Sequence, residues 1–224
     1  VFQIGLIGYT NAGKSTVINR LTDAATLEED KLFATLDPLT RKLTLPNQFQ
    51  ATITDTVGFI QDLPTQLIHA FHSTLEESRN MDVFLHVVDA STSFIDEHEK
   101  TVLDLLKDLD MDKTPMLTIY NKRDLAGPDF QPRLFPNIVI SALDDDDINR
   151  LKDFLWDEIA KMLVPYTKDL DASGPEARTM NKMQQETFVE SIEYIEETNA
   201  YRLRGYAKSN SKWLGDKATD ASDE

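Results

Sequence analysis

Residues 8–15 of this 224-residue chain read Gly-Tyr-Thr-Asn-Ala-Gly-Lys-Ser, which matches the phosphate-binding pattern G-x-x-x-x-G-K-[ST] at every specified position. Residues 2–7 before the motif have the apolar character of a buried strand, and residues 15–21 after it have the apolar spacing of a helix. A strand, a glycine turn and a helix N-terminus present backbone N–H groups and a partial positive charge to an anion. The motif therefore predicts a nucleotide phosphate site, without indicating which nucleotide.

We expect this loop and the first helical turn to contact the phosphates. Lys14 would reach the β- and γ-phosphates, and the Ser15 hydroxyl would bind Mg²⁺. The residues expected to contact the nucleotide in this segment are Gly8, Asn11, Ala12, Gly13, Lys14, Ser15 and Thr16.

The composition limits what else the chain can do. An apolar content of 41% is sufficient for a core, and the net charge of −16 disfavours broad binding to nucleic acids, whose phosphates it repels. The absence of cysteine excludes disulfides and thiolate metal sites and agrees with a reducing cytosol. No apolar run approaches the roughly 18 residues of a membrane-spanning helix. We therefore expect a cytoplasmic protein.

The hydrophobic pattern predicts alternating strands and helices. Three apolar runs are typical of buried parallel strands: residues 83–88, 116–120 and 138–140. Helical periodicity occupies residues 63–79, 95–109 and 147–163. Polar and apolar residues alternate over 41–45 and 48–55, which predicts an antiparallel hairpin at the sheet edge. This order predicts an α/β three-layer domain with a mostly parallel sheet.

The pattern changes after Pro165, so we expect two domains and a tail. A nucleotide-binding domain would span residues 1–164, a small α+β domain residues 165–214, and a disordered tail residues 215–224. In the small domain the predicted elements are a helix over 176–186 and a hairpin formed by 188–196 and 201–208. Because residue 1 is Val and lies within the first predicted strand, we expect an N-terminal part to be missing from the chain.

Two short patterns predict a switch that senses the third phosphate. Asp55-Thr-Val-Gly58 ends a predicted strand, where Asp55 would lie near Mg²⁺ through a water and Gly58 could donate its N–H to the γ-phosphate. Thr35 lies in the polar loop before the hairpin, from which a threonine can close onto Mg²⁺ and the γ-phosphate.

Residues 121–124, Asn-Lys-Arg-Asp, predict the base. The Asp124 carboxylate would accept hydrogen bonds from the guanine N1–H and exocyclic amine, which adenine lacks, so the wrong base would leave a buried carboxylate unpaired. The Lys122 stem would lie along the base, and Asn121 would tie this loop to the phosphate loop.

A fifth pattern, Ser141-Ala142-Leu143, follows another predicted strand and could offer a backbone N–H to the guanine O6. Five such patterns in this order predict an α/β GTPase that hydrolyses GTP to GDP and phosphate with Mg²⁺. A nucleotide-gated binding module, in which hydrolysis only times release, is the alternative from another class.

Several of these stretches closely resemble the HflX family of translation-factor-class GTPases. The resemblance rests on residues 8–16, 32–38, 55–59 and 63–64, and on the run Phe71–Arg79, and it covers residues 1–164 densely. It implies a P-loop GTPase that associates with the large ribosomal subunit and helps to split or rescue ribosomes. It also implies an N-terminal domain, which this chain does not contain. A GTPase of the same class that serves ribosome assembly or RNA modification is the alternative.

Phe59 occupies the position after Gly58 where many small GTPases have a glutamine that orients the attacking water. Phenylalanine cannot hydrogen-bond water, which predicts slow intrinsic hydrolysis and a water held by the Thr35 carbonyl or by a partner. Some GTPases that lack this glutamine have an asparagine at the position of Asn11 in the phosphate loop, where it helps to bind K⁺. We therefore expect a K⁺ ion there, which would offset charge developing on the phosphates. We thus expect roles in hydrolysis for Lys14, Thr35, Gly58 and Asn11.

Other polar residues carry no site prediction, and we expect no metal other than Mg²⁺. The run Asp144–Asp147 lacks the glycine and distal glutamate of a Ca²⁺ loop and is typical of a helix N-cap. His86 lies within an apolar strand, where a buried histidine with satisfied hydrogen bonds is the simplest interpretation.

Overall fold

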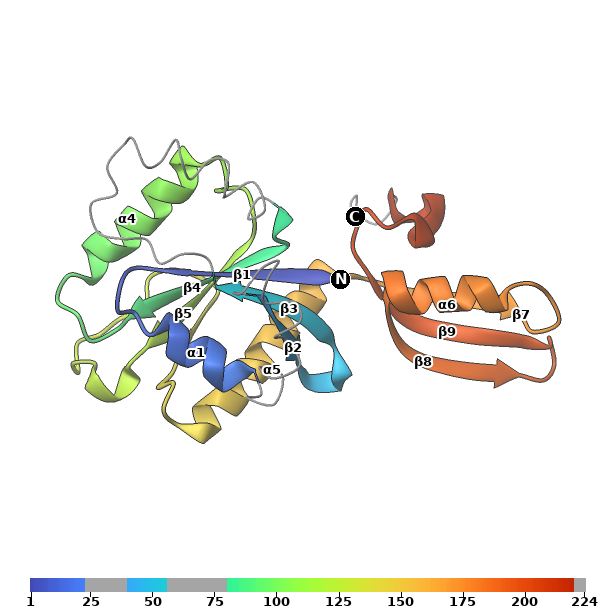
Figure 1. The fold of residues 1–224 in the computed structure, drawn as a ribbon, viewed down its shortest axis with the longest axis horizontal. Coiled ribbons are helices and arrows are strands. Elements are labelled where there is room, and N and C mark those ends of the chain that lie inside the picture. The colour runs from blue at the N-terminus through green and yellow to red at the C-terminus, as the bar shows by residue number, and fades with distance from the viewer. Residues whose placement is uncertain (23–39, 56–79, 220–224) are drawn as a thin grey trace. The chain divides into compact units, whose positions relative to one another are not determined.

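Residues 1–22, 40–55 and 80–219 are described by the structure, a computed structural model of the chain (Figure 1). The chain divides into two compact units. The larger unit contains Phe2–Leu45 and Gln50–Asp153, and the smaller contains Val1, Pro46–Phe49 and Phe154–Glu224.

A six-stranded sheet forms the centre of the larger unit, in the order β2-β3-β1-β4-β5-β6. Within the described residues its neighbouring strands are parallel, except for β2 and β3, which are antiparallel. The strands are β1 (Phe2–Gly8), β2 (Thr40–Thr44), β3 (Gln50–Asp55), β4 (Val83–Asp89), β5 (Met116–Asn121) and β6 (Asn137–Val139). This arrangement confirms the predicted α/β class with a mostly parallel sheet and a hairpin at its edge.

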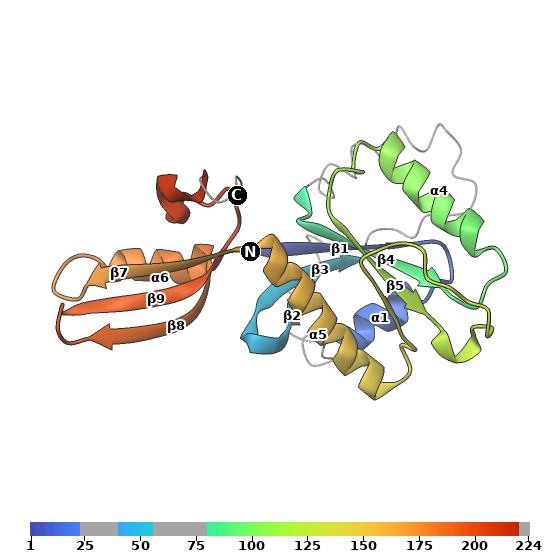
Figure 2. The same cartoon turned by 180° about the vertical axis from the view of Figure 1, so that it is seen from behind.

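Helices cover both faces of this sheet (Figures 1 and 2). Helix α4 (Ile95–Asp108) packs on one face, where Val102 and Leu106 join Phe84 and Ile7 in one buried cluster. Helix α1 (Lys14–Leu21) and the first part of α5 (Asp145–Met162) lie on the opposite face. The two later predicted helices are confirmed, with α5 beginning two residues earlier than predicted. The helix predicted over residues 63–79 lies outside the described residues.

The register of the parallel strands brings their carboxyl ends to one edge. Leu6 pairs with Asp55, and Gly8 at the end of β1 pairs with Val87 of β4. One strand further, Asp89 pairs with Asn121. Chain segments that follow parallel strands therefore meet at this edge, which is where ligands bind in open α/β sheets.

The centre of the sheet contains one polar exception. His86 of β4 is 1% exposed, and within the described part of the chain its Nδ1 has no hydrogen-bond partner. The expectation of a satisfied histidine is therefore wrong for this nitrogen: the register partners of His86 are Ile7 of β1 and Thr118 of β5, and neither forms a hydrogen bond with Nδ1. Because burial disfavours the charged imidazolium, it lowers the pKa of His86 from 6.5 to about 4.

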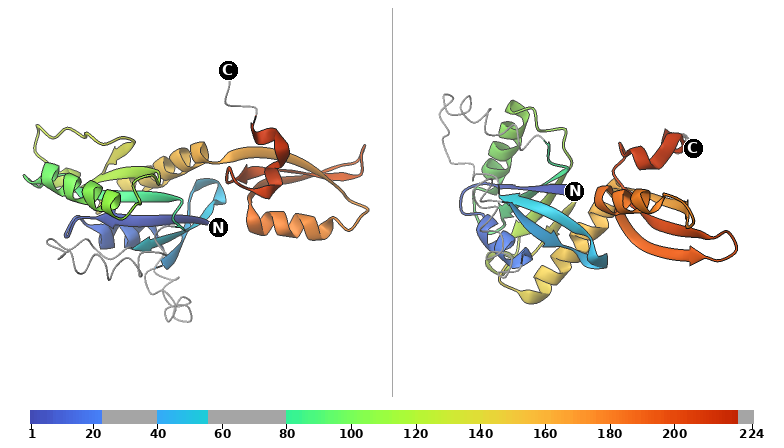
Figure 3. Two further views of the ribbon diagram at one scale, coloured as in Figure 1. Left: turned by 90° about the horizontal axis from the view of Figure 1, so that it is seen from above. Right: turned by 45° about the vertical axis from the view of Figure 1, so that its right-hand side comes forward.

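The smaller unit contains a three-stranded antiparallel sheet in the order β7-β9-β8 (Figure 3). Its elements are β7 (Val164–Asp171), α6 (Ala177–Glu186), β8 (Phe188–Ile195), β9 (Ala200–Ala207) and the 3₁₀ segment η5 (Lys212–Thr219). Helix α6 covers one face, where Met183 packs with Leu170 and Leu203. The predicted helix and hairpin are confirmed.

Strand β7 is absent from the sequence-based prediction. Its residues VPYTKDLD alternate between partly buried and exposed positions, but Leu170 is the one buried apolar residue and Lys168 interrupts the apolar face, so the sequence signal is weak. The strand forms because all eight of its residues pair with β9. The tail predicted from residue 215 overlaps η5, which extends to Thr219, and residues 220–224 lie outside the described residues.

An aromatic cluster belongs to the smaller unit and joins three of its segments. Phe49 follows the 3₁₀ turn η2 (Pro46–Gln48), and its ring centroid lies 5.1 Å from those of both Trp156 and Phe188. Trp156, on the last part of α5, also packs 5.7 Å from Tyr206 of β9. Tilted and edge-to-face contacts of this kind stabilise beyond the area that they bury.

Candidate nucleotide-binding site

The phosphate loop connects β1 to α1, and two of its motif positions require glycine. Gly13 caps α1 with φ 96°, and a Cβ there would lie 2.3 Å from Nδ2 of Asn121. A Cβ on Gly8 would lie 2.7 Å from the carbonyl oxygen of Val87. A larger residue at either position would push the loop away from β4 and β5, so the motif glycines allow it to approach the sheet edge closely.

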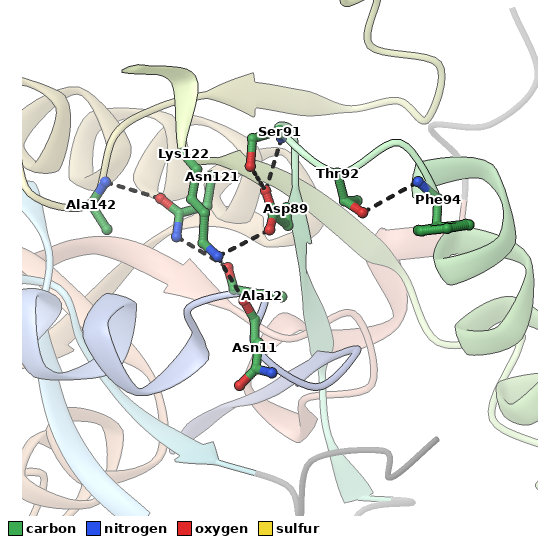
Figure 4. A network of polar contacts seen from close by, with 9 residues as sticks. All are labelled: Asn11, Ala12, Asp89, Ser91, Thr92, Phe94, Asn121, Lys122 and Ala142. Atoms are coloured by element: carbon green, nitrogen blue, oxygen red, sulfur yellow. Dashed lines mark hydrogen bonds and ion pairs between the residues drawn. The ribbon is translucent and has the colours of Figure 1, made fainter. Parts of the chain in front are cut away.

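Hydrogen bonds hold the carbonyl groups of this loop against the protein. Asn121 Nδ2 donates to the Ala12 carbonyl at 3.1 Å, and Lys122 Nζ donates to the Asn11 carbonyl at 2.9 Å (Figure 4). In a trans peptide the N–H points opposite to the preceding carbonyl, so the N–H of Gly13 faces away from Asn121. Helix α1 has no acidic side chain in its first turn to compensate its positive end. The loop thus has the geometry of an anion site.

Lys14, the motif lysine, is held by Asp55. Its Nζ lies 3.0 Å from Oδ1 of Asp55 at the end of β3, and the Lys14 side chain is only 10% exposed. The two residues are 41 positions apart, and the parallel pairing of β1 with β3 brings them together. A cation expected to contact phosphates and a carboxylate expected near Mg²⁺ therefore share one location.

Asn121 is the centre of the site (Figure 4). Besides donating to Ala12, its side chain accepts a hydrogen bond from the Ala142 N–H through Oδ1 at 3.0 Å. Asn121 is buried, so both polar atoms of its amide are satisfied inside the protein. One side chain thus joins the phosphate loop to the segment after β6. The sequence predicted its link to the phosphate loop but not its link to Ala142.

Lys122 has a second partner that sequence reasoning missed. Its Nζ lies 3.0 Å from Oδ2 of Asp89, the last residue of β4. Ser91 donates to the other oxygen of Asp89 through its N–H at 2.8 Å and its hydroxyl at 2.6 Å. Burial opposes ionisation, but the hydrogen bonds from Ser91 and Lys122 outweigh it and hold the pKa of Asp89 below its usual value. The sequence signal that could have indicated this partner is an aspartate at the end of an otherwise apolar strand.

Asp124 is exposed in the 3₁₀ turn η4 (Arg123–Leu125), where its carboxylate is accessible to a base. This turn is fixed by its neighbour: Arg123 donates through Nε and Nη2 to Oδ2 of Asp147, at 3.1 and 2.8 Å. The Ser141 N–H donates to the same oxygen at 2.7 Å. Asp147 therefore joins the two segments expected to enclose the base.

Asp147 is buried, which opposes its ionisation, but the Ser141 amide and the Arg123 and Arg150 guanidinium groups outweigh burial and lower its pKa. The acidic run also caps α5 as predicted, since the Asp147 N–H donates to Oδ1 of Asp144 at 3.0 Å. The link made by Asp147 was missed because its partners lie on other elements.

The segment after β6 is held from a third side. Arg20 of α1 donates through Nε to the Ala142 carbonyl at 3.1 Å and also pairs with Asp145. Leu143 of this segment is 77% exposed.

The remaining predicted site residues belong to other segments. Ser15 and Thr16 lie in the first turn of α1, whereas Thr35, Gly58 and Phe59 lie outside the described residues.

The likeness to known proteins agrees with this geometry. Residues 3–122 match the family described as 50S ribosome-binding GTPase. A GTPase HflX of Alkalihalophilus pseudofirmus is 45% identical over 210 residues, which are 93% of this chain and 49% of that protein. The chain belongs to the HflX family of GTPases. The HflX protein of Escherichia coli is 36% identical over 90% of this chain and 48% of its own length, so the chain spans about half of these two relatives.

Solved structures place the HflX-family chain in the P-loop GTPase fold. The crystal structure of a GTP-binding protein from Sulfolobus solfataricus in complex with GDP superimposes with a TM-score of 0.54 at 27% identity, over 70% of this chain and 51% of that one. The SsGBP–GDP complex gives a TM-score of 0.58 at 26% identity, over 72% of this chain and 50% of that one. The predicted fold class is thereby confirmed.

Proposed function

We propose that the chain binds GTP and hydrolyses it to GDP and phosphate with Mg²⁺. The observation that carries this proposal is the Asn121 side chain, which connects the Ala12 carbonyl of the phosphate loop to the Ala142 N–H. The phosphate end and the base end of one nucleotide would thereby be bound by a single connected structure. Membership of the HflX family supports the same activity.

Each residue of the site then has a distinct task. Lys14 leaves Asp55 to contact the β- and γ-phosphates, while the N–H groups of the phosphate loop bind the phosphate oxygens. Asp124 accepts the guanine N1–H and amine protons, and the backbone of residues 141–143 meets the guanine O6.

The residues present suit Mg²⁺. The Ser15 hydroxyl and the Asp55 carboxylate are oxygen donors of the kind that this ion prefers, and Mg²⁺ in nucleotide sites needs few protein ligands besides phosphate oxygens and water. When bound, it neutralises charge on the β- and γ-phosphates. Thr35 and the Gly58 N–H complete the γ-phosphate contacts in this proposal, so that residues around them respond to hydrolysis.

Hydrolysis is slow in the isolated chain, because Phe59 cannot orient water, and a partner accelerates it. The family description, 50S ribosome-binding GTPase, supports the large ribosomal subunit as that partner. Splitting or rescue of ribosomes in the cytoplasm is the corresponding role. Among the described residues, no helix is both long and apolar enough to span a bilayer. The nucleotide-binding domain of residues 1–164 and the appended domain of residues 165–214 stay predictions, and the C-terminal segment of the smaller compact unit begins earlier in the chain, with Phe154 in the last part of α5.

A K⁺ ion near Asn11 is the finer part of the proposal. Asn11 is exposed, and its backbone carbonyl accepts a hydrogen bond from Lys122, so in this proposal the oxygen of the side-chain amide binds the cation. Turnover compared in K⁺ and in Na⁺ at equal ionic strength tests this: faster turnover in K⁺ that is lost in Asn11→Ala supports it, and equal rates reject it.

The main test measures binding and turnover separately. Fluorescent GDP should bind the chain and be displaced by GTP and not by ATP, whereas displacement by ATP at the same concentration would contradict the guanine assignment. Phosphate release from GTP should be slow alone and faster with purified large subunits. Cosedimentation in the presence of a non-hydrolysable GTP analogue should favour mature subunits, and preference for precursor particles would instead indicate an assembly factor.

A further inference from the structure

The chain segment 89–98, from the end of β4 into α4, contacts the phosphate loop at two separate points. The first contact runs through Lys122. Its Nζ bridges Asp89 Oδ2 at 3.0 Å and the Asn11 carbonyl at 2.9 Å, so the charge of Asp89 holds the ammonium group against the loop (Figure 4). The Asp89 and Lys122 side chains are 18% and 32% exposed, which leaves the pair only partly screened by water.

The second contact is a stack of rings. The Tyr9 ring lies parallel to the imidazole of His98, with centroids 3.7 Å apart and 14° between the planes. Phe94, at the start of α4, lies 6.3 Å from the same imidazole at 29°. His98 therefore lies between a residue of the phosphate loop and a residue of its own segment.

Internal hydrogen bonds tie the two contacts together. The Ser91 N–H and hydroxyl donate to Asp89 Oδ1, and the Phe94 N–H donates to the Thr92 hydroxyl at 3.2 Å (Figure 4). The Ala90 N–H donates to the backbone carbonyl of Asn121 at 2.8 Å. The segment is thus attached to the end of β5 through Ala90, and to the phosphate loop through the Asp89–Lys122 pair and the His98–Tyr9 stack.

The phosphate loop needs such support. Asn11 has φ 64°, a left-handed conformation that asparagine adopts more readily than most residues but less readily than glycine, so contacts with its neighbours help to keep the loop in this shape. The Ala12 N–H donates to the Tyr9 carbonyl at 3.2 Å, so residues 9–12 form one tight turn that begins with Tyr9 and has Asn11 at its centre. A loop free to leave this shape would have to be reordered each time a nucleotide binds, which weakens binding.

We propose that residues 89–98 form a clamp on the phosphate loop, in which Asp89 and His98 are positioning residues that slow the release of guanine nucleotide. This clamp rests on the proposed nucleotide site. Neither residue touches the nucleotide: Asp89 acts through Lys122 and Asn11, and His98 acts through Tyr9. Loosening either contact raises the dissociation rate and the KM for GTP, and leaves kcat at saturating GTP nearly unchanged.

The experiment measures dissociation of fluorescent GDP after an excess of unlabelled GDP is added. Asp89→Asn keeps the shape of the side chain and its bond from Ser91 but removes the charge that holds Lys122. We expect dissociation about 3- to 10-fold faster, as for loss of a charged hydrogen bond that is partly exposed. Asp104→Asn, an exposed position on α4, is the matched control and should dissociate at the wild-type rate.

The ring stack is tested by two substitutions at one position. His98→Ala should accelerate dissociation about 3- to 10-fold, and His98→Phe should restore most of the wild-type rate because a phenyl ring can stack on Tyr9. Lys100→Ala, exposed on the same helix, is the control. Ser91→Ala removes one hydrogen bond to Asp89 and should give a smaller increase, which keeps the test decisive even if Asp89→Asn does not fold.

The clamp would be overturned if His98→Ala and Asp89→Asn both released GDP at the wild-type rate. If Asp89→Asn does not fold, Ser91→Ala takes its place in this comparison. An unrescued His98→Phe variant would overturn the stacking part of it. Failure of the underlying function looks different: the wild-type chain would then bind no guanine nucleotide, or Lys14→Ala would bind it as tightly as wild type.

Discussion

Lys14 Nζ lies 3.0 Å from Oδ1 of Asp55, so the phosphate-loop cation and the β3 carboxylate form an ion pair. Binding of a phosphate would compete with this ion pair, whereas Mg²⁺ held near Asp55 through a water would offset the charge of the carboxylate and favour separation of the pair. The pair therefore makes nucleotide affinity depend on the metal ion in a way that can be measured.

Asp55→Asn should uncouple GDP binding from Mg²⁺. Without Mg²⁺ the variant should bind GDP at least as tightly as wild type, because phosphate binding no longer has to break the ion pair between Lys14 and Asp55. With Mg²⁺ the gain in affinity should be about 10-fold smaller than in wild type, as expected for the loss of one of the few oxygen groups near the ion. Fluorescence titrations with Mg²⁺ and with a chelator give both values, and an unchanged Mg²⁺ effect would contradict the role of Asp55.

Asp124→Asn should exchange the base preference. An asparagine amide can donate to the O2 of xanthine but cannot accept both guanine protons, so GDP affinity should fall by about 100-fold or more and XDP should gain relative to GDP. The matched control is Asp129→Asn, an exposed aspartate of the same connection after β5. Competition titrations with GDP, XDP and ADP measure the preference, and unchanged GDP affinity would contradict the assignment.

Gly13→Ala should disrupt the phosphate loop. The new Cβ would lie 2.3 Å from Asn121 Nδ2 at a backbone φ of 96°, so Asn121 must move and its bonds to Ala12 and Ala142 weaken. We expect a free energy of unfolding lower by about 2 kcal/mol and GDP binding reduced by about 10-fold or more. Gly127→Ala, where a Cβ meets nothing within 4 Å, is the control. Equal effects of the two substitutions in denaturant titrations and binding would refute this.

His86 should make the fold sensitive to mild acid. Its pKa is about 4 in the folded chain and near 6.5 when unfolded, so below pH 6.5 the unfolded chain takes up a proton that the folded chain does not. Stability is therefore unaffected above pH 6.5 and falls by up to about 3 kcal/mol as the pH approaches 4.

His86→Leu removes the contribution of His86 to the pH dependence of stability. Comparison with wild type therefore separates this contribution from that of the carboxylates, which titrate in both proteins. The stability difference between His86→Leu and wild type, measured by urea unfolding at several pH values, should grow in favour of the variant between pH 6.5 and 4. A difference that stays constant over this range would show that burial does not suppress protonation of His86.

Much of the fold was predictable because it depends on local patterns. Strands β4 and β5 are short apolar runs and α4 has an apolar face, so each reveals itself without knowledge of its neighbours. Strand β7 could not be found in this way. It is mostly polar, and it becomes a strand only because β9 supplies the hydrogen-bonding partner along its whole length.

The candidate site divides along the same line. The sequence alone determined which residues could serve a guanine nucleotide, because Gly13, Lys14 and Asp124 belong to short motifs whose chemistry depends on residue type and spacing. Their roles at the nucleotide stay predictions, as do those of Thr35 and Gly58.

Only the tertiary structure decided how these residues are held. Asp89 meets Lys122 across 33 positions and Asn121 meets Ala12 across 109, and both contacts depend on the register of the parallel strands, which no local pattern encodes. The same register placed Tyr9 beside a helix that begins 86 positions later, where His98 can stack on it. Motif chemistry is a local property of the chain, whereas the support that gives a motif its shape comes from long-range packing.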